Sequence, residues 1–234
     1  MKKNINIVII PARIGSKRIK KKNIKLFNNS PIIKKTFEII KKSNLFNEIV
    51  LSSDSSKILT LGKKIGFTEL IKRPKKLSND YVGTNEVIVH AIKILEKKYN
   101  VANVCCIYPC NPFLQINDLK KGFDLIKKYK KSFFLTISNY SHPIERAFSL
   151  NKKNNEIKKI NNKFLKNRTQ DFKIKYFDAA QFYLATKETW LKKIIIDKIG
   201  IKIPNWRTVD IDTIEDWKRA ELFYKFLKKE KFIK

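Results

Sequence analysis

The stretch NINIVIIPARIGSKRIKKKN, residues 4–23, sets the fold expected for the rest of the chain. Its first eight residues form an apolar run of strand length, and the remainder is a loop rich in lysine and arginine. In an open α/β sheet, ligands bind at the carboxyl ends of the strands, where such a loop lies. Gly15, the Ser16 hydroxyl, the backbone amides and the cations together suit a polyphosphate. The alternative is a solvated basic loop in a lysine-rich chain.

The same loop excludes two common nucleotide sites. It matches neither the dinucleotide fingerprint GxGxxG nor the ATPase pattern GxxxxGK followed by Ser or Thr. A dinucleotide-binding Rossmann site and a Walker-type ATPase are therefore both disfavoured.

Strand-like and helix-like segments alternate along the rest of the chain. Strands are predicted at residues 4–11, 48–52, 67–71, 104–108, 133–138, 181–185 and 208–211. Helices are predicted at residues 30–43, 55–65, 85–99, 118–129, 187–194 and 214–228. Ser30 would cap the first helix and Thr213 the last. Apolar strands between helices indicate an α/β fold, with a mostly parallel sheet flanked by helices on both faces.

Residues from about 142 to 175 interrupt this alternation. They are rich in Asn and Lys and contain only short apolar runs, a pattern that favours a small protruding hairpin lobe. The chain has no internal repeat and no low-complexity linker. The prediction is a single domain over residues 1–234 with this lobe inserted.

The charge of the chain bears on its partners. It carries 52 Lys and Arg against 21 Asp and Glu, a net charge of +31, which favours an anionic partner or a surface biased toward lysine. The basic residues are nearly all lysines, in pairs spread along the whole chain. Nucleic-acid readers favour arginine and concentrate charge on one face. A composition bias is therefore preferred, and no specific nucleic-acid partner is expected.

The location of the protein follows from what the sequence lacks. No apolar stretch approaches the roughly 18 residues of a membrane helix, so no membrane association is expected. Asn4 and Asn6 interrupt the apolar start, and no small-residue cleavage site follows, which favours a strand over a signal peptide. Cys105, Cys106 and Cys110 are too closely spaced for a disulfide framework or a zinc site. We expect a cytoplasmic protein with reduced, mostly buried cysteines.

Four further segments carry candidate chemistry: SSDS at 52–55, RPKKLSND at 73–80, YPCNP at 108–112 and DIDTIED at 210–216. The first is interpreted as the cap of the next helix. Arg73 and Asp80 in the second are either ligand contacts or a surface ion pair. Asp210 and Asp212 alternate on the predicted strand, so their carboxylates would share one face and suit Mg²⁺ with a substrate phosphate. The alternative, a helix cap in a solvated turn, suits Asp216 better.

Together with ARIGSKRIKKKN at residues 12–23, these segments stand in the order found in the acylneuraminate cytidylyltransferases, and the chain resembles that family over almost its whole length. The resemblance implies a Rossmann-like nucleotidyltransferase fold and a homodimer formed through the protruding lobe. It implies CTP-dependent activation of a nine-carbon sugar acid to its CMP derivative, with release of pyrophosphate and with Mg²⁺ as cofactor.

The resemblance also distributes roles among the residues. The triphosphate and the leaving pyrophosphate would be held by Arg13, Ser16, Lys17 and Lys22. Asp210 and Asp212 would bind Mg²⁺, and one of them would accept the proton of the attacking hydroxyl. Arg13 and Lys22 are counted with these two carboxylates as catalytic. The remaining nucleotide contacts would come from Ala12, Asn23, Arg73, Asp80 and Pro109.

Departures from the family pattern indicate which sugar is bound. YPCNP stands where sialic acid enzymes carry QPTSP, and DAAQFY at 178–183 stands where they carry an NGAIY-like segment. With RTQD at 168–171, these features are similar to family members that act on pseudaminic acid, a diacetamido sugar acid. Changed donors and acceptors discriminate strongly, because an unmatched buried polar group is costly. The expected sugar contacts are Asn111, Arg168, Asp178, Gln181 and Tyr183.

Several alternatives stay open. Residues 181–183 are otherwise an ordinary core strand, and the acid is then N-acetylneuraminate, legionaminate or, more distantly, 3-deoxy-manno-octulosonate. A catalytically silent nucleotide- or RNA-binding protein of the same fold is the alternative from another class, and the intact DIDT pair disfavours it. Arg146 and Arg168 of the lobe would approach the sugar carboxylate. His142 is interpreted as a turn residue, and His90 is given no role.

Overall fold

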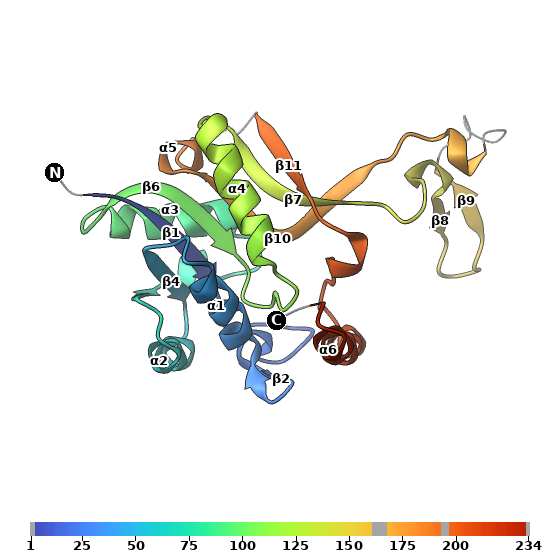
Figure 1. The fold of residues 1–234 in the computed structure, drawn as a ribbon. Helices are drawn as coiled ribbons and strands as arrows, with labels where there is room; N and C mark the ends of the chain where they lie inside the picture. The colour runs from blue at the N-terminus through green and yellow to red at the C-terminus, as the bar shows by residue number, and fades with distance from the viewer. Residues whose placement is uncertain (1–2, 161–167, 193–196, 233–234) are drawn as a thin grey trace.

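A computed structural model describes residues 3–160, 168–192 and 197–232. In that part of the chain, seven strands form one central sheet (Figure 1). The strands are β1 (Asn4–Pro11), β4 (Glu48–Ser53), β5 (Glu69–Lys72), β6 (Asn100–Ile107), β7 (Phe133–Asn139), β10 (Tyr176–Thr186) and β11 (Lys198–Lys202). Their order across the sheet is β11-β7-β10-β6-β1-β4-β5.

Most neighbouring strands run in the same direction. β1 pairs in parallel with β4 and β6, β4 with β5, and β11 with β7. Among these seven strands, β10 alone is antiparallel to both of its neighbours, β6 and β7. The predicted mostly parallel sheet is therefore confirmed, with one reversed strand in its middle.

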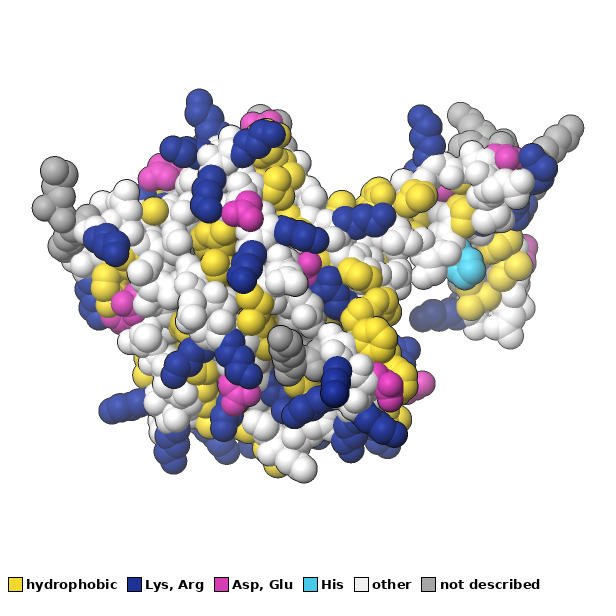
Figure 2. Space-filling model, viewed as in Figure 1, with side chains coloured by type: hydrophobic (Ala, Val, Ile, Leu, Met, Phe, Trp, Pro, Cys, Tyr) yellow, Lys and Arg dark blue, Asp and Glu magenta, His cyan; other side chains and the backbone are white. Residues whose placement is uncertain are grey.

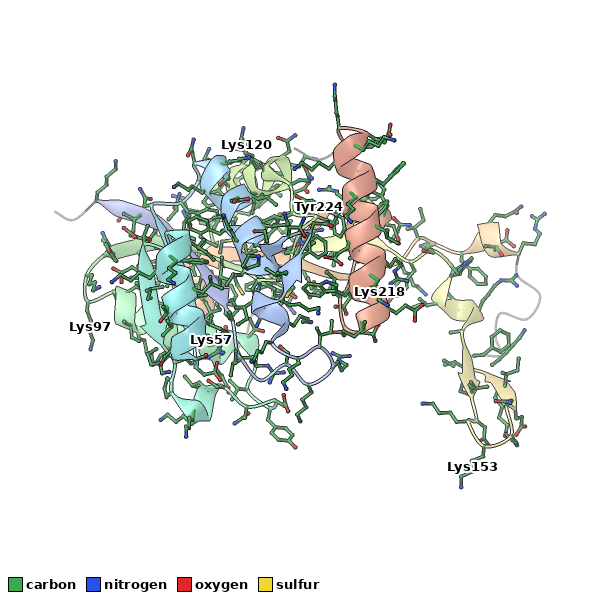
Figure 3. All side chains as sticks on the ribbon, turned by 90° about the horizontal axis from the view of Figure 1, so that it is seen from below. Lys57, Lys97, Lys120, Lys153, Lys218 and Tyr224 are labelled. Carbon is green, nitrogen blue, oxygen red and sulfur yellow. The ribbon has the colours of Figure 1, made fainter. Side chains whose placement is uncertain are left out.

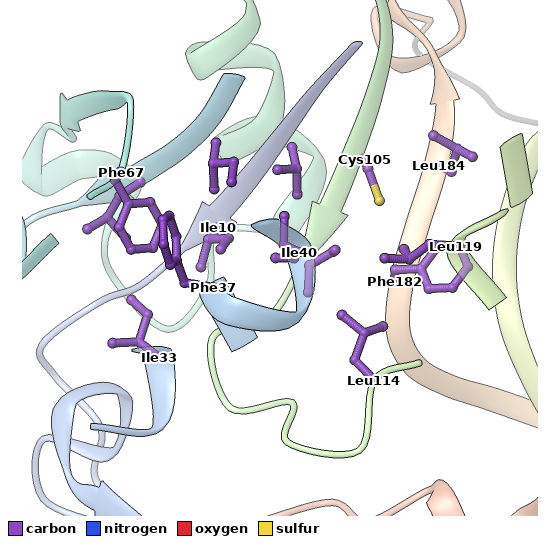
Figure 4. Close-up of a cluster of buried hydrophobic side chains, with 14 of the residues drawn as sticks. Ile10, Ile33, Phe37, Ile40, Phe67, Cys105, Leu114, Leu119, Phe182 and Leu184 are labelled. Atoms are coloured by element: carbon purple, nitrogen blue, oxygen red, sulfur yellow. The ribbon is translucent and has the colours of Figure 1, made fainter. Parts of the chain in front are cut away.

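Helices cover both faces of the sheet (Figure 1). One face carries α1 (Ile32–Ser43), α2 (Ser56–Ile65) and α4 (Ile116–Lys128). Figure 4 shows the cluster beneath them, in which Phe37 and Ile40 of α1 and Leu119 of α4 join Ile10 and Phe182 of the sheet. The residues that contact the sheet recur at helical spacing, and their burial is the main favourable free-energy term for this layer.

The opposite face is covered by α3 (Thr84–Leu95) and α5 (Lys187–Trp190). Ile88 and Ile92 of α3 pack with Trp190 of α5 against the strands, and the indole of Trp190 donates to the Val104 carbonyl at 2.9 Å. Cys105 and Cys106 on β6 point to opposite faces and are both buried and free, as expected.

The C-terminal helix α6 (Ile214–Lys229) packs through a third cluster against the small sheet of β2 (Leu26–Phe27) and β3 (Ser30–Pro31). The ring of Phe27 stands edge-on to Trp217 and Tyr224, with centroid distances of 5.6 and 5.4 Å. Figure 3 shows α6 along its length, with Lys218 near its start and Tyr224 further along. This contact fixes the segment before α6 beside the loop that follows β1.

A hairpin of β8 (Phe148–Leu150) and β9 (Ile157–Lys159) forms a separate two-stranded sheet that projects away from the central sheet (Figure 1). Phe148, Leu150 and Ile157 of this hairpin are exposed. Short 3-10 turns occur at η1 (Lys22–Ile24), η2 (Lys75–Leu77), η3 (Ile144–Arg146), η5 (Thr169–Asp171) and η6 (Asn205–Arg207).

Three local predictions were wrong. Residues 208–211 are extended chain without sheet partners, and the edge strand is β11, whose Lys-Ile-Gly-Ile-Lys sequence has too few apolar residues to stand out. Ser30 pairs with Phe27 in the small sheet, and Pro31 is the N-cap of α1 without a side-chain bond. The helix expected at 187–194 ends at Trp190, and positions 193–196 lie outside the described residues.

The surface has a scattered charge. Figure 2 shows lysine and arginine side chains spread over the visible face rather than gathered into one stripe. Among the described residues, no helix combines the length and apolar character needed to span a membrane.

Candidate active site

A cleft of about 860 Å³ opens at the carboxyl ends of β1 and β6, beside the first half of β10. Five parts of the chain line it: the loop after β1, the segment between β5 and α3 with the start of α3, the loop after β6, the first half of β10 and the segment before α6. The sequence-predicted residues in its lining are Arg13, Ser16, Lys17, Lys22, Asn23, Arg73, Asp80, Pro109, Asn111, Asp178, Gln181, Asp210 and Asp212.

The loop after β1 is anchored at both ends. Asp54 accepts a hydrogen bond from the Ile14 amide at 3.0 Å. The SSDS segment thus holds this loop, and the predicted capping role is wrong, because Ser55 makes no side-chain bond at the start of α2. At the other end, the Asn23 amide donates to the Arg13 carbonyl at 2.8 Å and accepts from the Cys110 thiol at 3.3 Å. Burial raises the pKa of that thiol to about 12.

Cations from this loop pair with Asp80 on the facing segment. The Arg13 guanidinium and the Lys17 ammonium group each contact one oxygen of the Asp80 carboxylate. These hydrogen bonds, from Lys17 first and then Arg13, lower the pKa of Asp80. Asp80 therefore occupies the position of an anion between two of the predicted phosphate-binding cations. Arg73 is buried below, its Nε donating to the Ser78 hydroxyl at 3.2 Å, and burial lowers its pKa.

A second group of cations faces the carboxylates before α6. Lys22 Nζ lies 3.3 Å from Asp212 Oδ1 and donates to the Ile211 carbonyl at 2.7 Å. Arg18 lies 2.8 Å from Asp212 Oδ2. Thr213 caps α6 in a capping box with Asp216, whose carboxylate also accepts from the Asp212 amide at 3.2 Å. These bonds place Asp212 beside the cationic loop although the predicted strand is absent.

Asp210 and Asp212, the predicted metal ligands, both line the cleft. Partial burial raises the pKa of Asp210, and the neighbouring Asp212 carboxylate raises it further. A cation between the two groups would relieve both effects. Across the residues that the structure describes, no cluster of three or more His, Cys, Asp or Glu could hold a metal. This pair fits Mg²⁺ completed by substrate phosphate and water.

The other end of the cleft presents polar side chains that are held by hydrogen bonds within the protein. The Asn111 amide donates to the Gln181 carbonyl at 2.7 Å, and Gln181 Nε2 donates to the Arg207 carbonyl at 2.8 Å. Arg207 itself is buried and ion-paired with buried Asp118 at the start of α4. Asp178 accepts from the Tyr183 hydroxyl at 2.9 Å and from the Ala180 amide at 2.8 Å.

Three predicted residues lie outside the cleft lining. Ala12 is fully buried in the core, and its amide donates to the Ser52 carbonyl at 2.9 Å. Tyr183 is not part of the lining, and its hydroxyl donates to the Asp178 carboxylate, which is. Arg168 lies in the projecting segment, ion-paired with Asp171 at 3.7 Å.

Sequence reasoning missed two arginines of the site, Arg207 and Arg18, and the anchoring role of Asp54. Arg207 lies in no recognisable motif, and its role follows from the ion pair with Asp118, which is distant in the sequence. Arg18 and Asp54 stood within the quoted motifs. Their partners, Asp212 and the Ile14 amide, are far away in the sequence.

The fold and the site define a nucleotidyltransferase-type protein: a mostly parallel sheet whose first loop presents cations to a pair of carboxylates across one cleft. The model of the family described as cytidylyltransferase matches residues 7–230. The chain therefore belongs to the cytidylyltransferase family, which confirms both the resemblance and the enzyme class that the sequence predicts.

Relatives within the family differ in their substrates. The chain is 37% identical over 224 residues to the pseudaminic acid cytidylyltransferase of Campylobacter jejuni, covering 94% of this chain and 96% of that protein. Identity to the CMP-N,N'-diacetyllegionaminic acid synthase of Legionella pneumophila is 26%, over 92% of this chain and 94% of that one.

Solved structures support the fold. The structure of CMP-2-keto-3-deoxy-manno-octonic acid synthetase complexed with CTP superposes with a TM-score of 0.68 at 12% identity. The match covers 93% of this chain and 97% of that one. The predicted Rossmann-like nucleotidyltransferase fold is confirmed.

Proposed function

We propose that this enzyme transfers CMP from CTP to pseudaminic acid and releases pyrophosphate. The observation that carries the proposal is the single cleft in which the cations of the first loop face the Asp210–Asp212 pair, with Gln181 and Asn111 at its far end. Support for the sugar comes from the 37% identity to the Campylobacter enzyme over nearly the whole chain, against 26% to the legionaminic acid synthase.

The nucleotide would lie along the loop after β1. Arg13, Ser16 and Lys17 line the cleft side by side and would hold the triphosphate. Nucleotide phosphates would compete with Asp80 for Arg13 and Lys17. Lys22, fixed by the Ile211 carbonyl, would neutralise charge on the departing pyrophosphate.

The chemical step needs an oxygen nucleophile and a leaving group in line. The anomeric hydroxyl of the sugar acid would attack the α-phosphorus, forming a new P–O bond as the bond to pyrophosphate breaks. Asp210 or Asp212 would accept the hydroxyl proton. When Mg²⁺ is bound, it would supply charge neutralisation at the phosphate, and the same two carboxylates would hold it.

We further propose a cytoplasmic homodimer. The exposed apolar residues of the projecting hairpin, Phe148, Leu150 and Ile157, would be covered by a second copy. In such a dimer, Arg168 of the projecting segment would contact the sugar, bound either in its own chain's cleft or in the cleft of the second copy. Sedimentation equilibrium of the wild type and of a Leu150→Ser, Ile157→Ser variant tests the dimer, which the double variant should weaken.

The catalytic proposal is tested by pyrophosphate release with CTP and Mg²⁺, run in parallel with pseudaminic acid and N-acetylneuraminic acid. Release with pseudaminic acid alone is the expected result. Preference for N-acetylneuraminic acid would leave the enzyme class standing and overturn the sugar assignment. Binding of CTP with no turnover on any nonulosonic acid would favour the silent binder instead.

A further inference from the structure

Gln181 carries a buried acceptor that nothing in the protein satisfies. The residue is buried, with only 3% of its surface exposed, yet it lines the cleft. Nε2 donates to the Arg207 carbonyl at 2.8 Å, whereas Oε1 is buried and has no hydrogen-bond partner among the described residues. A buried carbonyl oxygen without a donor is costly, because folding has removed the water that would otherwise bind it.

The orientation of this amide is determined by its surroundings. A backbone carbonyl can only accept, so the group that faces Arg207 must be the NH₂ of Gln181, and the oxygen must point elsewhere. The next residue, Phe182, points into the core beside Leu119 (Figure 4), which directs Gln181 to the other side of the strand.

A bulge in β10 fixes the backbone of Gln181. The register between β10 and β7 shifts between Asp178 and Tyr183, and Ala180 has a positive φ of 50°. In place of a strand partner, the Gln181 amide donates to the Thr136 hydroxyl at 3.0 Å, and its carbonyl accepts from Asn111 at 2.7 Å. Bulges beside active sites often aim a side chain in this way.

Arg207 completes the support. Its carbonyl holds Gln181 Nε2, and its guanidinium is fixed by Asp118 from another helix, with both side chains buried. Gln181 is thus held at its backbone and through one N–H of Nε2, and its acceptor Oε1 is left for a ligand.

The part of β10 that leads to Gln181 indicates the chemistry of the donor. Phe177, Ala179 and Ala180 precede Gln181 in this strand, line the same cleft and present small or apolar groups to it. An acceptor beside methyl-sized apolar groups matches an acylamino substituent, whose N–H donates and whose acyl methyl packs. A bare hydroxyl would supply the donor and leave the apolar surface uncovered.

We propose that Gln181 Oε1 accepts a hydrogen bond from the N–H of an acylamino group of the sugar acid, making Gln181 a specificity-determining residue; this rests on the proposed function. Arg207 is a positioning residue that holds the amide in this orientation.

The test uses two analogues of pseudaminic acid in which one acetamido group at a time is replaced by acetoxy, which keeps the carbonyl and methyl and removes only the N–H. With the wild-type enzyme, kcat/KM should fall about 10- to 100-fold for one analogue. In Gln181→Met, kcat/KM for pseudaminic acid should fall by a similar factor. For this variant, kcat/KM for the sensitive analogue should lie within about threefold of its kcat/KM for pseudaminic acid. KM for CTP should stay unchanged. Gln170→Met, at an exposed position, is the matched control and should behave as wild type.

Each other outcome overturns the proposal. Equal turnover of pseudaminic acid and both analogues by the wild type would exclude an N–H contact, and this arm does not depend on the variant folding. If replacing the N–H lowers kcat/KM by the same factor in Gln181→Met as in the wild type, Gln181 does not contact that N–H and its role is structural. Absence of any wild-type turnover on nonulosonic acids, with no sugar binding to the enzyme loaded with a non-hydrolysable CTP analogue, would remove the proposed function as well. Normal wild-type turnover with an unaffected variant would remove this inference alone.

Discussion

Asn23 illustrates how a residue can matter to a site without being proposed to touch the reacting atoms. The sequence predicts a nucleotide contact for it, and it does line the cleft. Its amide, however, is used at both ends, holding the Arg13 carbonyl and the Cys110 thiol. Asn23 therefore joins the loop proposed to bind phosphate to the loop after β6, so a change there would shift both loops together.

Asp212 gives the sharpest prediction at this scale. Asp212→Ala should lower kcat/KM at least 100-fold, because it removes a proposed metal ligand and leaves Arg18 and Lys22 without their anion. The melting temperature should change by no more than about 2 °C, since the side chain is partly exposed and its pairs are weak. Pyrophosphate release and thermal denaturation measure the two effects.

The matched control for Asp212 is Asp124→Ala on the exposed side of α4, whose carboxylate pairs with Lys127 at 3.3 Å. It should retain full activity. Near wild-type activity of Asp212→Ala at saturating Mg²⁺ would contradict the assignment.

At the scale of elements, a partly buried carboxylate ties β5 to the chain that follows α3. Glu69 accepts from the Tyr99 hydroxyl at 2.7 Å and from Lys98 at 3.0 Å. Burial alone would raise the pKa of Glu69, but the bonds from Tyr99 and Lys98 outweigh it and lower that pKa. A carboxylate whose pKa is lower in the folded than in the unfolded protein stabilises the fold when the pH is above its pKa in the unfolded chain. This stabilisation is lost as the pH falls through its pKa in the folded protein.

Glu69→Gln should therefore destabilise the protein by about 1 kcal/mol at pH 7. The difference from wild type should shrink as the pH falls below the ordinary glutamate pKa of about 4.3, and it should vanish once the carboxylate of the folded protein is protonated. Urea denaturation at several pH values measures it. Glu38→Gln, which loses an exposed pair with Lys34 and a charge interaction with Lys35, should show a smaller difference from wild type at pH 7 than Glu69→Gln. A pH-independent loss in Glu69→Gln would exclude the charge as the cause.

The start of α6 supports a second prediction about an element. Thr213 Oγ1 accepts from the Asp216 amide at 3.1 Å, directly after Asp212. Thr213→Ala should cost about 1 kcal/mol of stability, as measured by denaturation, and should reduce activity several-fold because the preceding carboxylate loses its support. Thr213→Ser keeps the acceptor and should restore both quantities. Failure of serine to do so would show that the methyl group, rather than the cap, is needed.

The elements were predictable to different degrees. β1, β4 and the helices with a clear apolar face follow from local periodicity, and the first loop and Asp210–Asp212 follow from motif recognition. β11 was missed because an edge strand with two apolar residues has little local signal. The Asp118–Arg207 pair and the bulge at Ala180 depend on contacts between distant segments, which periodicity does not reveal.

For the whole molecule, the net charge of +31 predicts binding to polyanions that depends on salt and not on sequence. Binding of unrelated single-stranded RNAs should weaken about tenfold or more between 50 and 200 mM salt, as counterion release requires. The affinities of different sequences should agree within about threefold. Fluorescence anisotropy measures this, and selective binding that persists at 200 mM salt would revive the nucleic-acid alternative.

The reversed direction of β10 has a consequence for how this chain can be altered. The strand that leaves toward the projecting hairpin and the strand that returns from it are direct neighbours: Asn139 pairs with Tyr176, and the Tyr140 amide donates to the Lys175 carbonyl. The hydrogen bonds between β7 and β10 thus continue up to the point where the projection begins. Everything from residue 142 to 174 could be replaced by a tight two-residue turn without lengthening any connection. Descendants of such a gene could enlarge, trim or exchange the projection as a cassette, while the sheet and its cleft stay as they are.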